Sequence, residues 1–123
     1  MKTSLDFISL QVRDRARSRT FYADLLGFSV DTASNPAATV FQDAMGAIFA
    51  IRDPFAPIAD ETQVGIGVGL WFSVTGKIEE WQQKLEDAGT TILKPAYDTP
   101  FGRAVNCADP DGYTLTLHES PSK

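Results

Sequence analysis

The chain has 123 residues, 43% of them hydrophobic, which is enough for one domain with its own core and without disulfides or a structural metal. Its net charge of −5 provides no basic surface for nucleic acid, and no run approaches the roughly 18 apolar residues of a membrane-spanning helix. The single cysteine, Cys107, excludes an intrachain disulfide and is typical of a reducing compartment. We therefore expect a cytoplasmic protein with neither a nucleic-acid nor a membrane partner.

The first half of the chain begins with a predicted strand and a predicted helix. Aliphatic residues at every second position of 7–12 give the strand one apolar face. An apolar stripe along 18–26 predicts a helix, and Gly27 can supply the left-handed residue that ends it. The other, mixed face of the strand carries Phe7, Ser9 and Gln11.

Three further strands are predicted after this helix, because turn residues separate three runs rich in strand-forming residues. The runs are 28–32, 38–43 and 47–52, and the turns lie at 34–36 and at Gly46. The following stretch, 54–64, is rich in proline and acidic residues and is the expected linker.

The same order recurs in the second half. Val12 corresponds to Val74 and Gly27 to Gly89, both 62 positions later. A strand over 69–74 has one apolar face and one mixed face. A helix over 77–88 and strands over 91–97, 102–108 and 113–119 follow, the last two joined by the hairpin signal Asp109-Pro110-Asp111-Gly112. The mixed face of the strand over 69–74 carries Gly69, Trp71 and Ser73.

This repeat predicts an α+β protein built from two strand–helix–strand–strand–strand units around a cavity. The units span 5–53 and 65–120, joined by the linker 54–64, within a single domain over 1–123.

Two motifs resemble the glyoxalase / bleomycin-resistance / extradiol-dioxygenase superfamily, also called vicinal oxygen chelate proteins. Phe21-Tyr22 with Leu25-Leu26-Gly27-Phe28 is similar to the family's "FY…LLGF" helix end, and Asp109-Pro110-Asp111-Gly112 to its "DPDG" hairpin. The resemblance implies two βαβββ modules that form an open, barrel-like, eight-stranded trough with the helices outside. The trough of such proteins holds the ligand and, in the enzymes, a divalent metal.

The resemblance also locates the positions of the metal ligands, which in the enzymes are His, Glu or Gln on the first and last strands of each module. Counted from the two motifs, with offsets of 62 for the first strands and 67 for the last, these positions here are Phe7, Phe49, Gly69 and Thr116. Phenylalanine and glycine side chains cannot coordinate a metal, and threonine is a poor ligand. We therefore predict no metal, no other cofactor and no catalytic residue. Cys107 could act as a nucleophile only if it were paired with His118. A cysteine in a predicted strand is more commonly a small, buried hydrophobic residue.

The mixed strand faces are typical of a small-molecule pocket, because they combine aromatic rings with a few hydroxyl and amide groups. Gly69 beside Trp71 leaves room for a planar group against the indole, although Trp71 could equally fill the trough. Tyr97, Phe101 and Arg103 are expected at the rim, where Arg103 either pairs with a ligand carboxylate or is a solvated strand residue. The predicted ligand-binding residues are Phe7, Ser9, Gln11, Phe49, Gly69, Trp71, Ser73, Arg103, Thr114, Thr116 and His118.

The leading hypothesis is a metal-independent binding protein of the bleomycin-resistance type, which sequesters an aromatic or drug-like organic ligand and thereby confers antibiotic resistance. Two alternatives stay open. One is a divalent-metal-dependent lyase, isomerase or dioxygenase, and the other is a structural or regulatory homodimer with a vestigial pocket. Because exposed sheet edges need cover and single-domain relatives are commonly dimers, we predict a homodimer.

Overall fold

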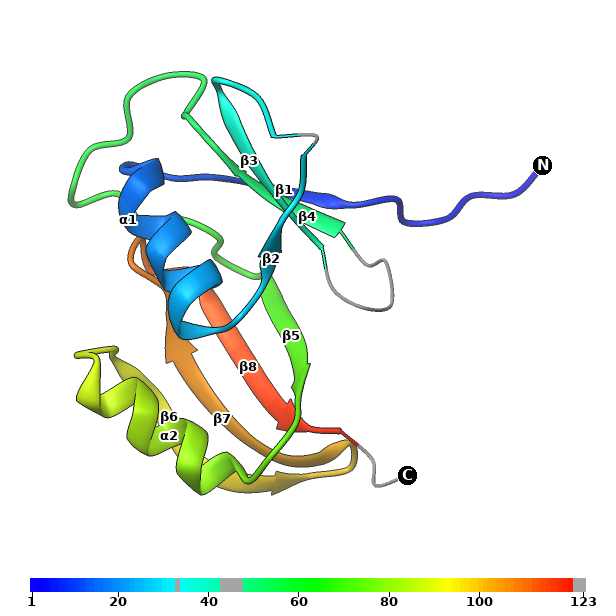
Figure 1. The fold of residues 1–123 in the computed structure, drawn as a ribbon, viewed down its shortest axis with the longest axis vertical. Coiled ribbons are helices and arrows are strands. Elements are labelled where there is room, and N and C mark those ends of the chain that lie inside the picture. The colour runs from blue at the N-terminus through cyan, green and yellow to red at the C-terminus, as the bar shows by residue number, and fades with distance from the viewer. Residues whose placement is uncertain (33, 43–47, 121–123) are drawn as a thin grey trace. The chain divides into compact units, whose positions relative to one another are not determined.

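The computed structural model describes residues 1–32, 34–42 and 48–120. The chain divides into two compact units, residues 1–62 and 63–123, which we call module one and module two (Figure 1). Each contains a strand, a helix and three more strands, so the α+β class and the two βαβββ modules are confirmed. The predicted turn at Gly46 and the strand ends at Asp43 and Ala47 lie outside the described residues.

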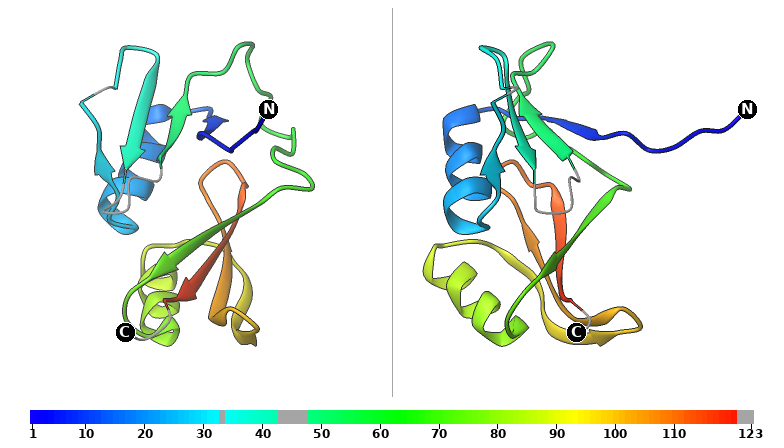
Figure 2. Two further views of the ribbon diagram at one scale, coloured as in Figure 1. Left: turned by 90° about the vertical axis from the view of Figure 1, so that its right-hand side faces the viewer. Right: turned by 45° about the vertical axis from the view of Figure 1, so that its right-hand side comes forward.

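Module one contains a four-stranded mixed sheet in the order β1-β4-β3-β2, in which β1 and β4 are parallel and the other neighbours antiparallel. In each module the helix packs against a face of its own sheet (Figure 2). The elements of module one are β1 (Ile8–Gln11), α1 (Arg15–Arg19), its π-helical continuation η1 (Thr20–Leu25), β2 (Ser29–Val30), β3 (Ala38–Gln42) and β4 (Ile48–Arg52).

The first helix begins three residues before the predicted start. Asp14 caps it, because its side chain accepts a hydrogen bond of 3.1 Å from the backbone N–H of Arg17. Gly27 follows the helix with a φ of +89°, the left-handed conformation that the sequence predicted for it.

The core of module one is aromatic. Tyr22 lies at the centre of the cluster and is fully buried, with its ring centroid 5.2 Å from that of Phe49 and 5.7 Å from that of Phe41. Phe28 stands edge-on to Phe49 at 5.0 Å, and Phe21 stands edge-on to Tyr22 at 5.1 Å. Such edge-to-face pairs contribute about 0.5–1.5 kcal/mol each beyond the area that they bury. The helix residue Tyr22 thus packs onto strands β3 and β4 through Phe41 and Phe49.

Module two repeats the arrangement with a sheet in the order β5-β8-β7-β6, in which β5 and β8 are parallel. Its core is aliphatic, formed by residues such as Ile78, Leu85 and Leu115 that are fully buried. No helix in the described residues of either module is long and apolar enough to span a membrane. The elements of module two are β5 (Gly69–Val74), α2 (Ile78–Asp87), β6 (Ile92–Thr99), β7 (Gly102–Ala108) and β8 (Thr114–Glu119).

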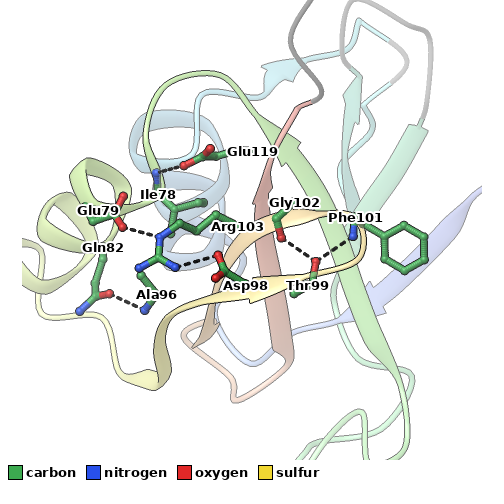
Figure 3. Close-up of polar contacts among 10 residues, drawn as sticks. All are labelled: Ile78, Glu79, Gln82, Ala96, Asp98, Thr99, Phe101, Gly102, Arg103 and Glu119. Atoms are coloured by element: carbon green, nitrogen blue, oxygen red, sulfur yellow. Dashed lines mark hydrogen bonds and ion pairs between the residues drawn. The ribbon is translucent and has the colours of Figure 1, made fainter.

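Both ends of helix α2 are capped by residues that lie outside the helix. The carboxylate of Glu119, at the end of β8, accepts a hydrogen bond of 2.9 Å from the N–H of Ile78 and so caps the helix start (Figure 3). At the other end Thr90 donates to the carbonyl of Leu85 and Gly89 to that of Glu86, with Gly89 at a φ of +80°. This is a Schellman motif, so the predicted role of Gly89 is confirmed.

The Asp109–Gly112 segment forms the predicted turn between β7 and β8. One carboxylate oxygen of Asp109 accepts hydrogen bonds of 2.9 Å from the backbone N–H groups of Asp111, Gly112 and Tyr113. Asp109 is itself buried, so the turn is organised around an acceptor shielded from solvent. The turn fixes the register in which β7 and β8 pair.

Candidate functional site

The register of module two brings side chains from four strands onto one face of its sheet. Trp71 pairs with Thr116, Thr116 with Asn106, and Asn106 with Lys94, which makes a row across all four strands. A neighbouring row runs from Ser73 through His118 and Ala104 to Tyr97. Paired residues project to the same side of a sheet. We call this surface the candidate face; it consists of Gly69, Trp71, Ser73, Lys94, Tyr97, Ala104, Asn106, Ala108, Thr114, Thr116 and His118.

An aromatic group stands at the β5 side of this face. The Trp71 side chain is 48% exposed, and its ring centroid lies 6.0 Å from that of Phe101 at an interplanar angle of 82°. The ring of His118 also lies near the indole, with centroids 5.8 Å apart. A Cβ added at Gly69 would lie 3.8 Å from the indole nitrogen, at ordinary van der Waals distance. An exposed indole with two further rings nearby is suited to stacking a planar ligand.

Hydrogen-bonding groups lie beside this aromatic group. The hydroxyl oxygen of Ser73 and Nε2 of His118 are 3.2 Å apart, and which of them donates depends on the imidazole tautomer. Among the described residues, Nδ1 of His118 and Oδ1 of Asn106 are buried and have no hydrogen-bond partner. An unpaired buried polar atom costs about 1–3 kcal/mol, so a ligand that reached these atoms would recover that cost.

The two threonines predicted for the site lie in β8 on the same face. Thr116 pairs with Trp71 and is 2% exposed, whereas Thr114 pairs with Gly69 and is half-buried. The structure therefore brings together six of the predicted binding residues, all in module two: Gly69, Trp71, Ser73, Thr114, Thr116 and His118.

Arg103 lies on the opposite face of the sheet, toward α2 (Figure 3). Its guanidinium contacts the carboxylate of Glu79 at 2.5 Å and that of Asp98 at 3.0 Å. The hydrogen bond to Glu79 raises the pKa of Arg103 and lowers that of the Glu79 carboxyl. The predicted place of Arg103 at the rim is thus corrected: it joins α2 to the β6–β7 hairpin. Tyr97 and Phe101, its predicted neighbours at the rim, lie on or beside the candidate face.

The predicted residues of module one are not brought together in the same way. Phe7 precedes β1 and is exposed, as is Ser9. The side-chain oxygen of Gln11 accepts a hydrogen bond of 2.9 Å from the N–H of Phe55 and so fastens the segment after β4. Among the described residues of module one, the face that carries Ser9 and Gln11 shows no aromatic cluster comparable to that around Trp71.

Phe49 requires a correction. It pairs with Ile8 and is 8% exposed, and its ring packs in the aromatic core, on the face opposite Ser9. Ser9 pairs with Ala50, as the corresponding Trp71 pairs with Thr116, so the last strands correspond with an offset of 66 rather than 67. The offset of 67 aligns Pro54 with Pro121, but Pro54 lies four residues after Ala50 whereas Pro121 lies five residues after Thr116.

The corrected positions for the family's metal ligands are Phe7, Ala50, Gly69 and Thr116. Three of these side chains have no donor atom and the fourth offers one hydroxyl, so the residues present do not fit a divalent ion. In the described part of the chain no three His, Cys, Asp or Glu side chains lie close enough to hold a metal together.

Cys107 lies in β7 opposite Leu115, on the α2 side of the sheet, whereas His118 lies on the candidate face. Burial, together with the charge of Asp109, raises the pKa of the Cys107 thiol to about 12. The thiol is therefore protonated at neutral pH, and the register separates it from the imidazole. The predicted role of Cys107 as a buried hydrophobic residue is confirmed.

A hollow of about 250 Å³ lies elsewhere, beside the first turns of α2, and none of the predicted binding residues lines it. The indole N–H of Trp81 donates to the carbonyl of Thr75 in its wall, at 2.8 Å. Its lining residues are Thr75, Gly76, Lys77, Glu80, Trp81 and Lys84.

Sequence reasoning missed the two polar residues Asn106 and Lys94 of the candidate face, as well as the small residues Ala104 and Ala108. Asn106 could have been found from the alternation in 102–108, where Ala104, Asn106 and Ala108 share one face. Lys94 could not, because β6 shifts its register between Ile92 and Lys94 and again before Tyr97, which breaks the period of two.

A model of the Glyoxalase/Bleomycin resistance protein/Dioxygenase superfamily matches residues 4–117. No curated protein sequence matches the chain. A glyoxalase-related enzyme from Fulvimarina pelagi is similar in structure, with a TM-score of 0.76 and 22% identity, over 98% of this chain and 90% of that one. A glyoxylase/bleomycin resistance protein/dioxygenase domain from Frankia sp. EAN1pec has a TM-score of 0.75 at 19% identity, and the match covers 98% of this chain and 100% of that one. A lactoylglutathione lyase from Agrobacterium tumefaciens has a TM-score of 0.71 at 17% identity, and the match covers 96% of this chain and 94% of that one. At these identities the likeness concerns the fold.

Proposed function

Since the chain belongs to the Glyoxalase/Bleomycin resistance protein/Dioxygenase superfamily, we propose that it is a metal-independent binding protein of the bleomycin-resistance type. It would sequester an aromatic or drug-like molecule at the candidate face. The observation that supports this most is the half-exposed indole of Trp71, flanked by Phe101 and His118 and bordered by the buried, unpartnered Oδ1 of Asn106.

The residue chemistry favours binding over metal catalysis. The positions that would hold the metal offer a single hydroxyl, and the one thiol is buried and protonated. By contrast, the candidate face combines aromatic surface with a few convergent polar groups, which is the usual composition of an organic ligand site. Stacking on Trp71 would contribute about 0.5–1.5 kcal/mol beyond area burial, or about a 2- to 12-fold change in affinity.

The two tryptophans allow a matched test of this function. In the variant Trp81→Phe the remaining indole is Trp71, and in Trp71→Phe it is Trp81, whose N–H is bonded to Thr75. A panel of planar aromatic drugs titrated in the presence of a chelator should quench the first variant saturably and leave the second unchanged. Trp71→Ala should weaken binding at least 2-fold. No quenching and no thermal shift with any member of the panel would contradict the proposal.

Metal analysis distinguishes the enzyme alternative. Protein purified without chelators should contain less than stoichiometric Zn, Ni, Mn or Fe. A stoichiometric divalent ion whose removal abolishes ligand binding would favour the metal-dependent lyase, isomerase or dioxygenase instead.

We also propose that the protein acts as a homodimer in the cytoplasm. The outer strands β1 and β2 of one sheet and β5 and β6 of the other are edges that a second copy could cover. Sedimentation at micromolar concentration should give the mass of two chains, and a single-chain mass would contradict the dimer.

A further inference from the structure

We propose that the ligand of the candidate face is an aromatic anion, with its ring against Trp71 and its anionic group at Lys94; this inference rests on the proposed function. The row Trp71–Thr116–Asn106–Lys94 supplies the order of groups: an indole at one edge of the sheet, a hydroxyl and an amide in the middle, and an ammonium at the other edge.

The spacing of the row sets the length of the ligand. Three steps between neighbouring strands, each about 4.8 Å, place the backbones of Trp71 and Lys94 about 14 Å apart. Both side chains are long and can lean toward the middle of the face. A ligand with roughly 5–10 Å between ring and charge therefore spans them.

The charge distribution of module two favours an anion over a cation. Residues 63–120 include eight carboxylates, and none belongs to the candidate face. Four lie on α2, Asp109 and Asp111 lie in the β7–β8 turn, and Asp98 and Glu119 are engaged with Arg103 and the start of α2. Among the described residues of this face, Lys94 is therefore the one charged side chain.

Lys94 is positioned to receive such a group. Its ammonium lies 4.0 Å from the ring centroid of Tyr97, in the neighbouring row of the face, and the residue is exposed. The contact with Tyr97 orients the ammonium but leaves its charge uncompensated by a carboxylate. Asn106, beside it in the row, has an amide that can add a hydrogen bond to a ligand oxygen.

Three probes of one shape test the charge preference: 3-(2-naphthyl)propanoate, its primary amide, and 3-(2-naphthyl)propylamine. In calorimetry at low salt, we expect the carboxylate to bind about 5- to 10-fold more tightly than the amide, as a partly exposed charge-assisted hydrogen bond would give. The amine should bind most weakly. The preference should shrink as salt is raised, because both charges are near solvent.

Variants of Lys94 test whether this residue causes the preference for the carboxylate over the amide. Lys94→Met should abolish the advantage of the carboxylate over the amide, and Lys94→Arg should retain it. Lys84→Met is the matched control, because Lys84 likewise lies over an aromatic ring, Trp81, but on α2. It should leave the preference unchanged.

The outcomes separate this inference from the proposed function. If the three probes bind with equal affinity, or if the amine binds best, the anionic ligand is excluded while binding at Trp71 stands. If Lys94→Met keeps the preference for the carboxylate, Lys94 is excluded as the group that receives the anion, and the inference fails in that form. If none of the probes changes the Trp71 fluorescence of the Trp81→Phe variant or gives heat, both proposals fail.

Discussion

The two modules share one topology but differ in where their aromatic clusters lie. In module one the rings of Tyr22, Phe41 and Phe49 pack between helix and sheet. In module two the buried residues of that layer are chiefly aliphatic, and Trp71 and Phe101 are exposed to solvent. The same scaffold therefore buries an aromatic cluster in one copy and exposes one in the other, where we propose that it binds the ligand.

The sharpest way to break this comparison is to remove one ring from each module. Phe49→Ala should lower the free energy of unfolding by about 3–5 kcal/mol, because it leaves a cavity in a packed core. Trp71→Ala should cost clearly less, because about half of the residue is already in solvent and no closed cavity is left. Denaturant titrations of both variants measure the difference. Equal costs would show that Trp71 is a core residue and would remove the basis for the candidate face.

A second test concerns the turn that fixes the register of module two. Asp109→Ala should lower the free energy of unfolding by about 2–4 kcal/mol, because three backbone N–H groups lose their shared acceptor. Asp109→Asn keeps an acceptor oxygen and should cost clearly less. If both variants cost the same small amount in denaturant titrations, the turn does not set the register.

The helix caps distinguish the modules on a smaller scale. Asp14 caps α1 from the adjacent position, whereas Glu119 caps α2 from the end of β8. Asp14→Ala and Glu119→Ala should each cost about 0.5–2 kcal/mol. Hydrogen exchange should differ between them: the second should raise exchange in both α2 and the end of β8. Increased exchange confined to α2 would mean that the capping contact does not couple the two elements.

The smallest expected effects are pH dependences within module two. The pKa of Glu79 is lowered in the folded state, chiefly by its hydrogen bond from Arg103, so the stability that this pair supplies is present above the ordinary value of 4.5 and is lost as pH falls below it. The stability difference between the native protein and Glu79→Gln should therefore shrink as pH is lowered from 6 to about 3. A difference that stays constant over this range would exclude the pair as its cause.

Cys107 gives the opposite sign at high pH. Its folded pKa of about 12 lies above its ordinary value of 9.0, so the unfolded thiol ionises first and stability should fall as pH rises above 9.0. The fall should be smaller in Cys107→Ala, and iodoacetamide should label the native thiol far more slowly than the denatured one. Equal labelling rates would show that the thiol is not buried.

The sequence predicted the repeat, both helices and the turn at Asp109 because each depends on local signals: apolar periodicity, a terminal glycine, and a turn residue beside proline and glycine. The alternation of apolar and mixed positions in 69–74, also a local signal, predicted on which face of its strand Trp71 lies. It misplaced Phe49, because the correspondence of the two last strands depends on pairing between strands rather than on residue order. It could not foresee the engagement of Arg103 or the position of Lys94, since these depend on tertiary contacts and on irregularities of β6.

The most direct test of metal-independent binding at the candidate face uses the two indole N–H resonances in an NMR spectrum of the chelator-treated native protein. Addition of 3-(2-naphthyl)propanoate should shift the Trp71 resonance saturably, while that of Trp81, bonded to Thr75, stays in place. A Trp71 resonance that does not move, or that moves only after a divalent metal is restored, would contradict the account.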